Sequence, residues 1–580
     1  MTTRPASPNR NRNLASRCAA LAVAAVAASA PAFSASWLHH LQRVQYPLNV
    51  GARSVEIERD LGGGYIYLAD HISPLILSAG ANTRPIFVRT SAKLEAQTCY
   101  TYLRPGEWNT LYATDLYLLS TDFATTADRG FIICGNYAEI GADEGAFLLK
   151  VDENLTPQWF RQFPERQLGN FINDIAFNSI VETTQNGAPI YAVAGSIFTT
   201  TNQQALIAAF DSQGFPMWSQ EILGTEGLWG EAAEVINYDA DSIAIVGTAN
   251  VAPHDICNNF LAQGDVLVAI LQNDGLFEFA GIFGQTTGQV NSTPVTFAER
   301  GNSIARVNGS ADLMLTGSIT AWRNTGQECG SPLIDAMLAF RVTPVGGVIW
   351  ANRYSITSGN TDLTGVQIKP ITAFAMIVAD GWTTLNGFWS QNVAYFRLMA
   401  GNGSLAAQTE LFGGPGTERA AGILPEGPPW PQAATILGTS DSFANGFHSD
   451  PKPWLIGRMP SARRTCEDAT VFTTIVPVPL PPHDFLINAP QFPLRSQPLV
   501  LISQTVSDWL ICANTIIGDI NGDGGVTVGD IGGFVLALTD PAAYAVAFPD
   551  GDLEAADIND DGVISVGDIS GFVQLLTGGA

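Results

Sequence analysis

One unit of hydrophobic and polar positions recurs along most of the chain. It consists of an apolar strand, a short turn with Gly, Asn or Asp, and a second strand that usually ends in an aromatic residue. Clear copies begin at residues 146, 205, 266, 336 and 393, and weaker ones begin at 85 and 454. A further apolar strand precedes each copy and often ends on Gly plus a small residue, as in "YAVAGS" from Tyr191. A third apolar segment lies upstream again, as in "EAAEVINY" from Glu231.

Three to four short strands in each of about seven units are the pattern of a β-propeller. A closed ring also protects the strand edges of neighbouring units. We therefore predict a mainly β fold, with a propeller of about seven blades over residues 37–470. Six or eight blades remain open, because the first and last copies are weak. The repeat resembles the propellers of secreted bacterial proteins, and we expect Trp159, Trp218 and Trp350 to pack between blades.

The repeat stops after Cys466. Residues 471–515 are rich in proline, as in "IVPVPLPPHDFLINAPQFP" from Ile475, and favour a stiff, extended connector. The run "PLVLISQTVSDWLIC" from Pro498 predicts one or two strands within it.

The chain ends in two matching acidic loops, "DINGDGGVTVGD" from Asp519 and "DINDDGVISVGD" from Asp557. A twelve-residue calcium loop offers oxygen ligands at positions 1, 3, 5, 7, 9 and 12, with Gly at position 6. The predicted ligands, with the position-7 residues acting through their carbonyls, are Asp519, Asn521, Asp523, Gly525, Thr527 and Asp530 in the first loop and Asp557, Asn559, Asp561, Val563, Ser565 and Asp568 in the second. Short helices are predicted to follow at Asp530–Thr539 and Asp568–Thr577. We predict a site for two calcium ions.

This duplicated loop and helix resembles dockerin over residues 516–580. The likeness is to type I dockerins, and it is closest to a variant that ends secreted proteins of some environmental bacteria. The resemblance implies a small α-helical, calcium-folded module that binds a cohesin-like partner. Two features depart from cellulosomal dockerins: a longer segment separates the loops, and positions 10 and 11 are Val528-Gly529 and Val566-Gly567 instead of Ser-Thr.

Residues 1–34 have the features of an export signal, with four arginines followed by the apolar run "LAVAAVAASA" from Leu21. We expect a secreted or cell-surface protein with no membrane span in the mature chain. The formal charge of −26 argues against binding to nucleic acid.

Six cysteines remain after removal of the signal, which favours disulfides in an exported chain. Cys466–Cys512 would tie the connector to the propeller, and Cys257–Cys329 would join equivalent loops of consecutive blades. A Cys99–Cys134 bond follows by elimination.

The chain lacks the HExxH, GxSxG, P-loop and GxGxxG motifs, so no catalytic residues and no organic cofactor are predicted. Four isolated acids could face the propeller axis, namely Glu231, Glu234, Asp255 and Glu418. The simpler interpretation is that they lie in solvated loops. Our first hypothesis is a non-catalytic binding or scaffold propeller that is assembled through its tail and contacts a glycan or a surface protein. One alternative is a dockerin-borne polysaccharide hydrolase or lyase with its site in the propeller channel. The other is a structural surface or adhesion protein.

Overall fold

The computed structural model places the described residues in two compact units, which lie within Trp37–Asn514 and Thr515–Ala580. The described residues are 37–44, 51–60, 64–72, 83–90, 96–103, 116–139, 144–164, 166–168, 171–198, 203–224, 230–249, 264–285, 287–290, 292–323, 333–356, 362–371, 373–385, 388–413, 416–425, 434–440, 452–458, 468–471, 473–478, 482–483, 485–488, 495–496, 500–504, 506–514, 518–521, 526–548, 553–556, 558 and 564–576. The expected export signal at 1–34 lies outside them.

The described strands of the first unit form seven antiparallel sheets, which we number by their order along the chain. Sheet 1 contains β2 (Gly51–Arg59), β3 (Tyr65–Ile72), β4 (Thr83–Thr90) and β5 (Ala96–Leu103). Sheet 2 contains β6 (Leu116–Thr125), β7 (Phe131–Glu139), β8 (Glu144–Val151) and β9 (Pro157–Pro164). Sheet 3 contains β10 (Arg166–Leu168), β11 (Phe171–Gln185), β12 (Ala188–Phe198), β13 (Gln203–Asp211) and β14 (Pro216–Gly224).

Sheet 4 contains β15 (Gly230–Asn237), β16 (Ser242–Ala249), β17 (Asp265–Gln272) and β18 (Phe277–Phe283). Sheet 5 contains β19 (Thr287–Val290), β20 (Thr293–Arg306), β21 (Leu313–Arg323), β22 (Ile334–Val342) and β23 (Val348–Ile356). Sheet 6 contains β24 (Asp362–Pro370), β25 (Phe374–Leu385), β26 (Phe388–Met399) and β27 (Thr409–Phe412). Sheet 7 combines β28 (Glu418–Pro425), β29 (Ala434–Ser440) and β30 (Lys452–Arg458) with β1 (Trp37–Val44).

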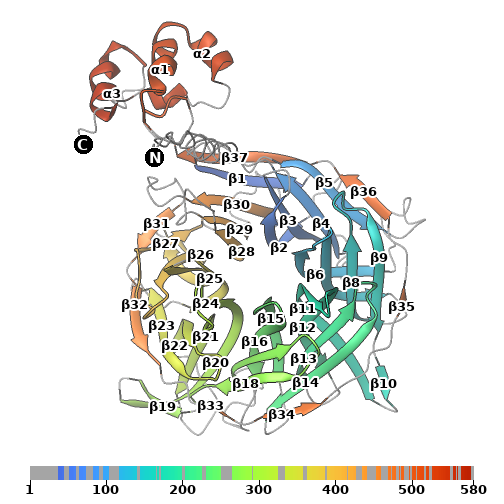
Figure 1. Cartoon of the computed structure of the whole chain (residues 1–580). Coiled ribbons are helices and arrows are strands. Elements are labelled where there is room, and N and C mark those ends of the chain that lie inside the picture. Colours follow the sequence, from blue (N-terminus) through green and yellow to red (C-terminus); the bar gives the residue numbers. More distant parts are fainter. Residues whose placement is uncertain are drawn as a thin grey trace, which may run out of the picture. The chain divides into compact units, whose positions relative to one another are not determined.

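Figure 1 shows these sheets around a ring, with the first long strand of each sheet on the inside. The chain is therefore mainly β and its first unit is a propeller, as predicted. Sheet 7 closes the ring, because β1 from the start of the unit pairs with β30 from its last repeat. Apolar side chains from adjacent sheets form separate cores at the joints between them, as sheets 4 and 5 do around Val268 and Leu338.

The outermost strand of every sheet comes from residues 468–514. These strands are β31 (Asp468–Val471), β32 (Thr473–Pro477), β33 (Pro482–His483), β34 (Phe485–Asn488), β35 (Arg495–Ser496), β36 (Val500–Gln504) and β37 (Val506–Asn514). The prediction of a connector with one or two strands is thus incomplete. The segment follows the periphery of the ring and contributes a short strand to each sheet.

The aromatic residue near the end of each repeat joins neighbouring sheets. The indole N–H of Trp159 donates to the carbonyl of Ser212 at 3.1 Å, and that of Trp218 donates to Asn273 at 2.9 Å. Trp350 donates to Ala400 in the same way at 3.1 Å. In each case the acceptor lies in the turn between the last two strands of the next sheet. The prediction that these Trp residues pack between blades is confirmed.

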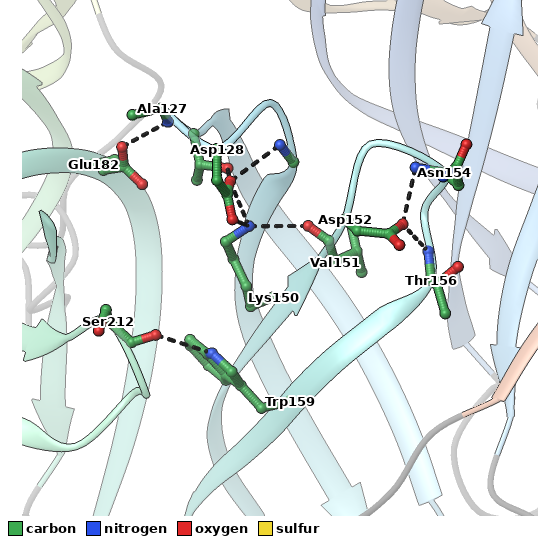
Figure 2. A network of polar contacts seen from close by, with 12 residues as sticks. Ala127, Asp128, Lys150, Val151, Asp152, Asn154, Thr156, Trp159, Glu182 and Ser212 are labelled. Carbon is green, nitrogen blue, oxygen red and sulfur yellow. Dashed lines mark hydrogen bonds and ion pairs between the residues drawn. The ribbon is translucent and has the colours of Figure 1, made fainter.

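A second polar link joins sheets 2 and 3 (Figure 2). The ammonium of Lys150 is buried and lies 2.9 Å from both carboxylate oxygens of Asp128. The neighbouring Ala127 N–H donates to Glu182 of sheet 3 at 2.7 Å. Burial alone would raise the pKa of Asp128, but its bonds to Thr126 and Lys150 lower it. This turn therefore holds one ion pair and one bond between sheets.

The turn glycine that faces each aromatic residue should be sensitive to substitution. Gly275 has φ +89°, and a Cβ there would lie 2.8 Å from the Trp218 ring. Gly309 has φ +75°, but a Cβ there would meet nothing within 4 Å. Gly309→Ala should lower the free energy of unfolding by about 1 kcal/mol, because alanine is strained in a left-handed backbone conformation. Gly275→Ala should cost about 1–3 kcal/mol more, because its methyl also displaces the indole. Chemical denaturation of both variants measures this difference, and equal losses would show that the indole contact contributes nothing.

The second unit contains short helices around a small core. They are α1 (Asp530–Thr539), α2 (Pro541–Ala547), η3 (Leu553–Ala556), η4 (Val566–Asp568) and α3 (Ile569–Leu576). The predicted helix Asp530–Thr539 matches α1, and the second predicted helix is divided between η4 and α3. Phe534 and Phe572, which occupy equivalent positions, stack at 4.2 Å between ring centroids. The long segment between the loops supplies α2, whose Tyr544 donates to the carbonyl of Ile520 at 2.7 Å.

The predicted Cys99–Cys134 disulfide is wrong, because both cysteines are free and buried. Cys99 lies in the core between sheets 7 and 1, whereas Cys134 lies in the core between sheets 2 and 3. Cys257, Cys329 and Cys466 lie outside the described residues, and nothing is described of the Cys512 side chain. Among the described helices, none has the length and apolar character needed to span a membrane.

Candidate functional sites

The innermost strands carry a bulge at the same height in all seven sheets. In sheet 4 the register shifts between Ala232 and Glu234, directly opposite Gly247 of the second strand. A Cβ at Gly247 would lie 2.0 Å from the carbonyl oxygen of Glu231, which explains the glycine that recurs at this point. The residues that follow the seven bulges are Glu56, Asp122, Ser179, Glu234, Ser303, Gln367 and Gly422.

Most of these post-bulge side chains accept a hydrogen bond from the next sheet. Asp122 Oδ2 accepts from the N–H of Ile180 at 2.9 Å and from Ser179 Oγ at 2.7 Å. Glu234 Oε2 accepts from the N–H of Ile304 at 2.6 Å. The remaining bonds of this kind run from Val235 to Ser179 at 3.2 Å, from Ile368 to Ser303 at 3.0 Å and from Ile423 to Gln367 at 2.6 Å. We call this set of bonds the axial belt.

Sheet 7 interrupts the axial belt, because its post-bulge residue is Gly422. The amide of Gln367 in sheet 6 instead donates to Glu56 Oε2 of sheet 1 at 2.6 Å. A Cβ at Gly422 would lie 3.0 Å from Glu56 Oε1, so the glycine leaves room for this contact. The axial belt thus links sheet 6 directly to sheet 1.

Lys369 is the cation that four axial carboxylates face. Burial would lower its pKa, but Glu56, Glu234, Glu58 and Asp122 raise it, so the ammonium stays charged. Burial raises the pKa of Asp122 to about 7 despite its bonds from sheet 3. Burial also raises the pKa values of Glu56, Glu58 and Glu234, and Lys369 partly opposes each shift.

A second pair of acids lies near the starts of β22 in sheet 5 and β24 in sheet 6. Asp335 accepts from Thr320 Oγ1 at 3.1 Å and lies near Asp362 of the next sheet. Burial and the nearby Asp362 raise the pKa of Asp335 to about 6. Trp382 is the direct cross-strand partner of Asp362, and 41 % of its surface is exposed. This carboxyl pair with an exposed indole is a candidate sugar-binding arrangement.

The expectation that the four isolated acids are solvated loop residues is wrong for those that are described. Glu231 and Glu234 lie in β15, and Glu418 begins β28, where it is buried and accepts from Ser440 Oγ at 3.0 Å. Of these, Glu234 belongs to the axial group around Lys369. Asp255 lies outside the described residues.

Sequence reasoning missed Glu56, Asp122, Gln367 and Lys369. A usable signal exists, because the next strand along the chain contains a recognisable motif, Gly or Ala followed by a polar residue. Each of the four residues lies on the strand directly before that motif strand. The motif strand is β3, which begins at Tyr65, in sheet 1 and β7, which begins at Phe131, in sheet 2.

The first acidic loop is closed by its position-12 carboxylate. Asp530 is fully buried, and its Oδ1 accepts from the N–H groups of Ile520 at 2.8 Å and Asn521 at 3.0 Å. Its Oδ2 accepts from the N–H of Thr527 at 2.7 Å. These bonds hold positions 2, 3 and 9 of the loop around one carboxylate. Asp519 at position 1 is 5 % exposed.

The second loop repeats this closure. Asp568 is fully buried, with Oδ1 accepting from Ile558 N–H and Oδ2 from Ser565 N–H, both at 2.8 Å. The two loop units are connected where Gly518 N–H donates to the carbonyl of Ala555 at 2.8 Å.

Half of the predicted calcium ligands are described, and their oxygens fit the proposed ion. Asn521 and Thr527 of the first loop contact Asp530, and Ser565 of the second contacts Asp568, while Asp519 is buried. Carboxylate, amide and hydroxyl oxygens are the donors that calcium takes. The other predicted ligands lie outside the described residues: Asp523, Gly525, Asp557, Asn559, Asp561 and Val563. Among the residues described, no group of three or more His, Cys, Asp or Glu side chains forms a metal cluster.

The helices of this unit expose matching apolar side chains. Phe534 and Phe572 are buried, whereas apolar residues next to them on the same helices are exposed. The exposed residues occupy positions 10, 13 and 17 counted from each loop start: Val528, Ile531 and Val535 in the first half and Val566, Ile569 and Val573 in the second. We call these two sets the paired apolar triads. Val528 and Val566 are 80 % and 81 % exposed.

Comparison with known proteins identifies no family. No family model matches the chain, and no curated protein matches it. Among solved structures, the chain is similar to an α-L-arabinanase of Penicillium chrysogenum determined in complex with arabinobiose. The match has 7 % sequence identity and a TM-score of 0.31, and it covers 73 % of this chain and 98 % of the arabinanase. A likeness this weak carries no argument about the site.

Proposed function

We propose that the protein is an exported scaffold in which a seven-bladed, non-catalytic propeller is assembled through a calcium-dependent, dockerin-like module. Each of the seven sheets is taken as one blade. The cohesin-like partner binds the module, and the propeller presents its own surface to a glycan or a surface protein. The protein acts outside the cell or at its surface.

This proposal rests mainly on the exposure of the paired apolar triads. Six apolar side chains at matching positions are exposed in a unit whose core is small. Exposed apolar surface is costly in water unless a partner covers it. The same positions lie on or beside the helices that follow two calcium-type loops, so metal binding would fix their spacing.

The contacts of the axial acids support a structural role for them. Asp122 and Glu234 accept hydrogen bonds from the next sheet, and Glu56 accepts from Gln367. A general acid or base needs a proton path to substrate, whereas these oxygens bind protein donors. This favours a scaffold over the alternative of an enzyme with its catalytic acids on the axis.

The proposal is tested with the full chain carrying Val528→Asp and Val566→Asp together. This double variant should lose capture by a panel of purified cohesin domains in the presence of calcium. It should still bind calcium, because position-10 side chains are not ligands. Val345→Asp is the matched control, since Val345 is 85 % exposed but lies in the propeller. Capture that survives the double substitution, or no capture of the unmodified chain by any cohesin, would overturn the proposal.

A second candidate function is a carbohydrate-active enzyme borne by the same module. The pair of Asp335 and Asp362 beside the exposed Trp382 favours it, because glycoside hydrolases use two acids, one of raised pKa, on either side of the scissile bond. Release of reducing ends from a polysaccharide by the full chain, and its loss in Asp335→Asn, would favour this function over the scaffold.

A further inference from the structure

Residues 468–514, here named the outer strap, visit the sheets in reverse order. The outer strap pairs first with β27 of sheet 6 and then with sheets 5, 4, 3, 2 and 1. It ends on sheet 7, where β37 pairs with β1 from Trp37 to Val44. Every contact is an antiparallel backbone pairing on the outer edge of a sheet. Figure 1 shows these strands on the periphery of the ring.

The outer strap covers edges that would otherwise be open. Without it, the fourth strand of each of the first six repeats would present unpaired N–H and C=O groups, a template for association with other chains. The strap itself is a poor template. Pro477 and Pro482 lie within its strands, and proline at a sheet edge cannot donate a further hydrogen bond.

The outer strap also fastens the closing sheet a second time. The order of sheet 7 is β28, β29, β30, β1, β37, so β1 lies between the last repeat and the end of the strap. Separating β1 from β30 opens the ring, and β37 holds β1 from the other side. The registered contact with β37 runs along the whole of β1.

We propose that the outer strap is a clamp that sets the lifetime of the closed ring. The ring opens only after the strap has left the outer edges, so strap detachment precedes the rate-limiting step of unfolding. Each strap strand is short and can leave singly, but the ring is released only when the strap has detached as a whole. This role is independent of the partner that binds the C-terminal unit.

The register offers a single-substitution test. Gln504 in β36 is the direct partner of the native Cys99 in β5. Directly opposed residues share a sheet face at a separation that a disulfide can span. Gln504→Cys therefore permits a disulfide that staples the strap to sheet 1. Ser503→Cys is the matched control, because Ser503 pairs with Tyr100 and belongs to the opposite face. Burial raises the pKa of the Cys99 thiol to about 12, so the bond is best formed during refolding in a glutathione buffer.

Unfolding rates of the full chain are measured by dilution into guanidinium with tryptophan fluorescence. Oxidised Gln504→Cys should unfold at least about tenfold more slowly than the same protein after reduction. Ser503→Cys and the unmodified chain should show only the smaller redox difference that bonds among their other cysteines produce. Ile502→Pro, which weakens the pairing of β36, should unfold faster with its β circular dichroism retained. Unchanged rates in a stapled protein with a confirmed bond, or in Ile502→Pro, would overturn the clamp.

Discussion

Chelation of calcium is expected to unfold the C-terminal unit of the intact chain and to leave the propeller folded. Asp519 and Asp530 are buried in the first loop, and Asp568 is buried in the second. Without a cation, the carboxylates of each loop repel one another, and the small core around Phe534 and Phe572 offers little to offset this. Each ion at a hundredfold excess over its dissociation constant would contribute about 2.7 kcal/mol.

Limited proteolysis read by mass spectrometry measures this effect. In chelator, cleavage should spread through residues 515–580 while 37–514 stays protected. Asp519→Ala with Asp557→Ala should behave in calcium as the unmodified chain behaves in chelator. Asp540→Asn is the control, because it removes an acid outside the loops and keeps the side-chain cap of α2, where Asp540 accepts from Ala543 N–H. Equal protection with and without calcium would contradict the expected coupling of metal binding to folding.

Lys369→Met is expected to destabilise the propeller in a pH-dependent way. The substitution removes the cation that Glu56, Glu58, Asp122 and Glu234 face. At pH 8 the loss should be about 1–3 kcal/mol, because four nearby carboxylates lose the opposite charge that Lys369 supplies. The four carboxyls already have raised pKa values, so folding favours their protonated forms and the propeller loses stability as pH rises. In the Lys369→Met variant, the stability of the propeller falls more steeply above about pH 5, where the carboxyls of the unfolded chain are ionised. The difference in stability between the variant and the unmodified chain disappears near pH 4.

Denaturant unfolding at pH 4 and pH 8 checks this result. Lys369→Met/Glu58→Gln should recover part of the stability at pH 8, because it removes one of the uncompensated carboxylates. A loss of the same size at both pH values would show instead that Lys369 acts through packing alone.

The repeat unit was predictable because its strands carry a local signal. The segment at Tyr191 lies within β12, and the terminal residues Trp159 and Trp218 join sheets as expected. These features combine an apolar strand with a turn and an aromatic residue, which sequence alone reveals.

The axial belt was not predictable in the same way. Its members differ in chemical type from sheet to sheet, as Asp122, Ser179 and Gln367 do, and share a place on the first long strand, after a bulge. A bulge changes register without leaving a periodic signal. The convergence of Glu234 with Lys369 is likewise a product of ring closure.

The outer strap was missed for a related reason. Its strands run from two to nine residues and contain prolines, so Pro477 and Pro482 favoured a connector. Their partners lie far away in the sequence, and long-range pairing leaves no local pattern. The Cys99–Cys134 disulfide was predicted only by elimination, which gives no information about the distance between two thiols. The two thiols lie in different cores.

Calcium binding to the metal-stripped full chain, followed by isothermal titration calorimetry, tests the central claim most directly. The account predicts two bound ions per chain and none in the variant that carries Asp519→Ala and Asp557→Ala. An unmodified chain that binds no calcium, or a variant that still binds two ions, would contradict it.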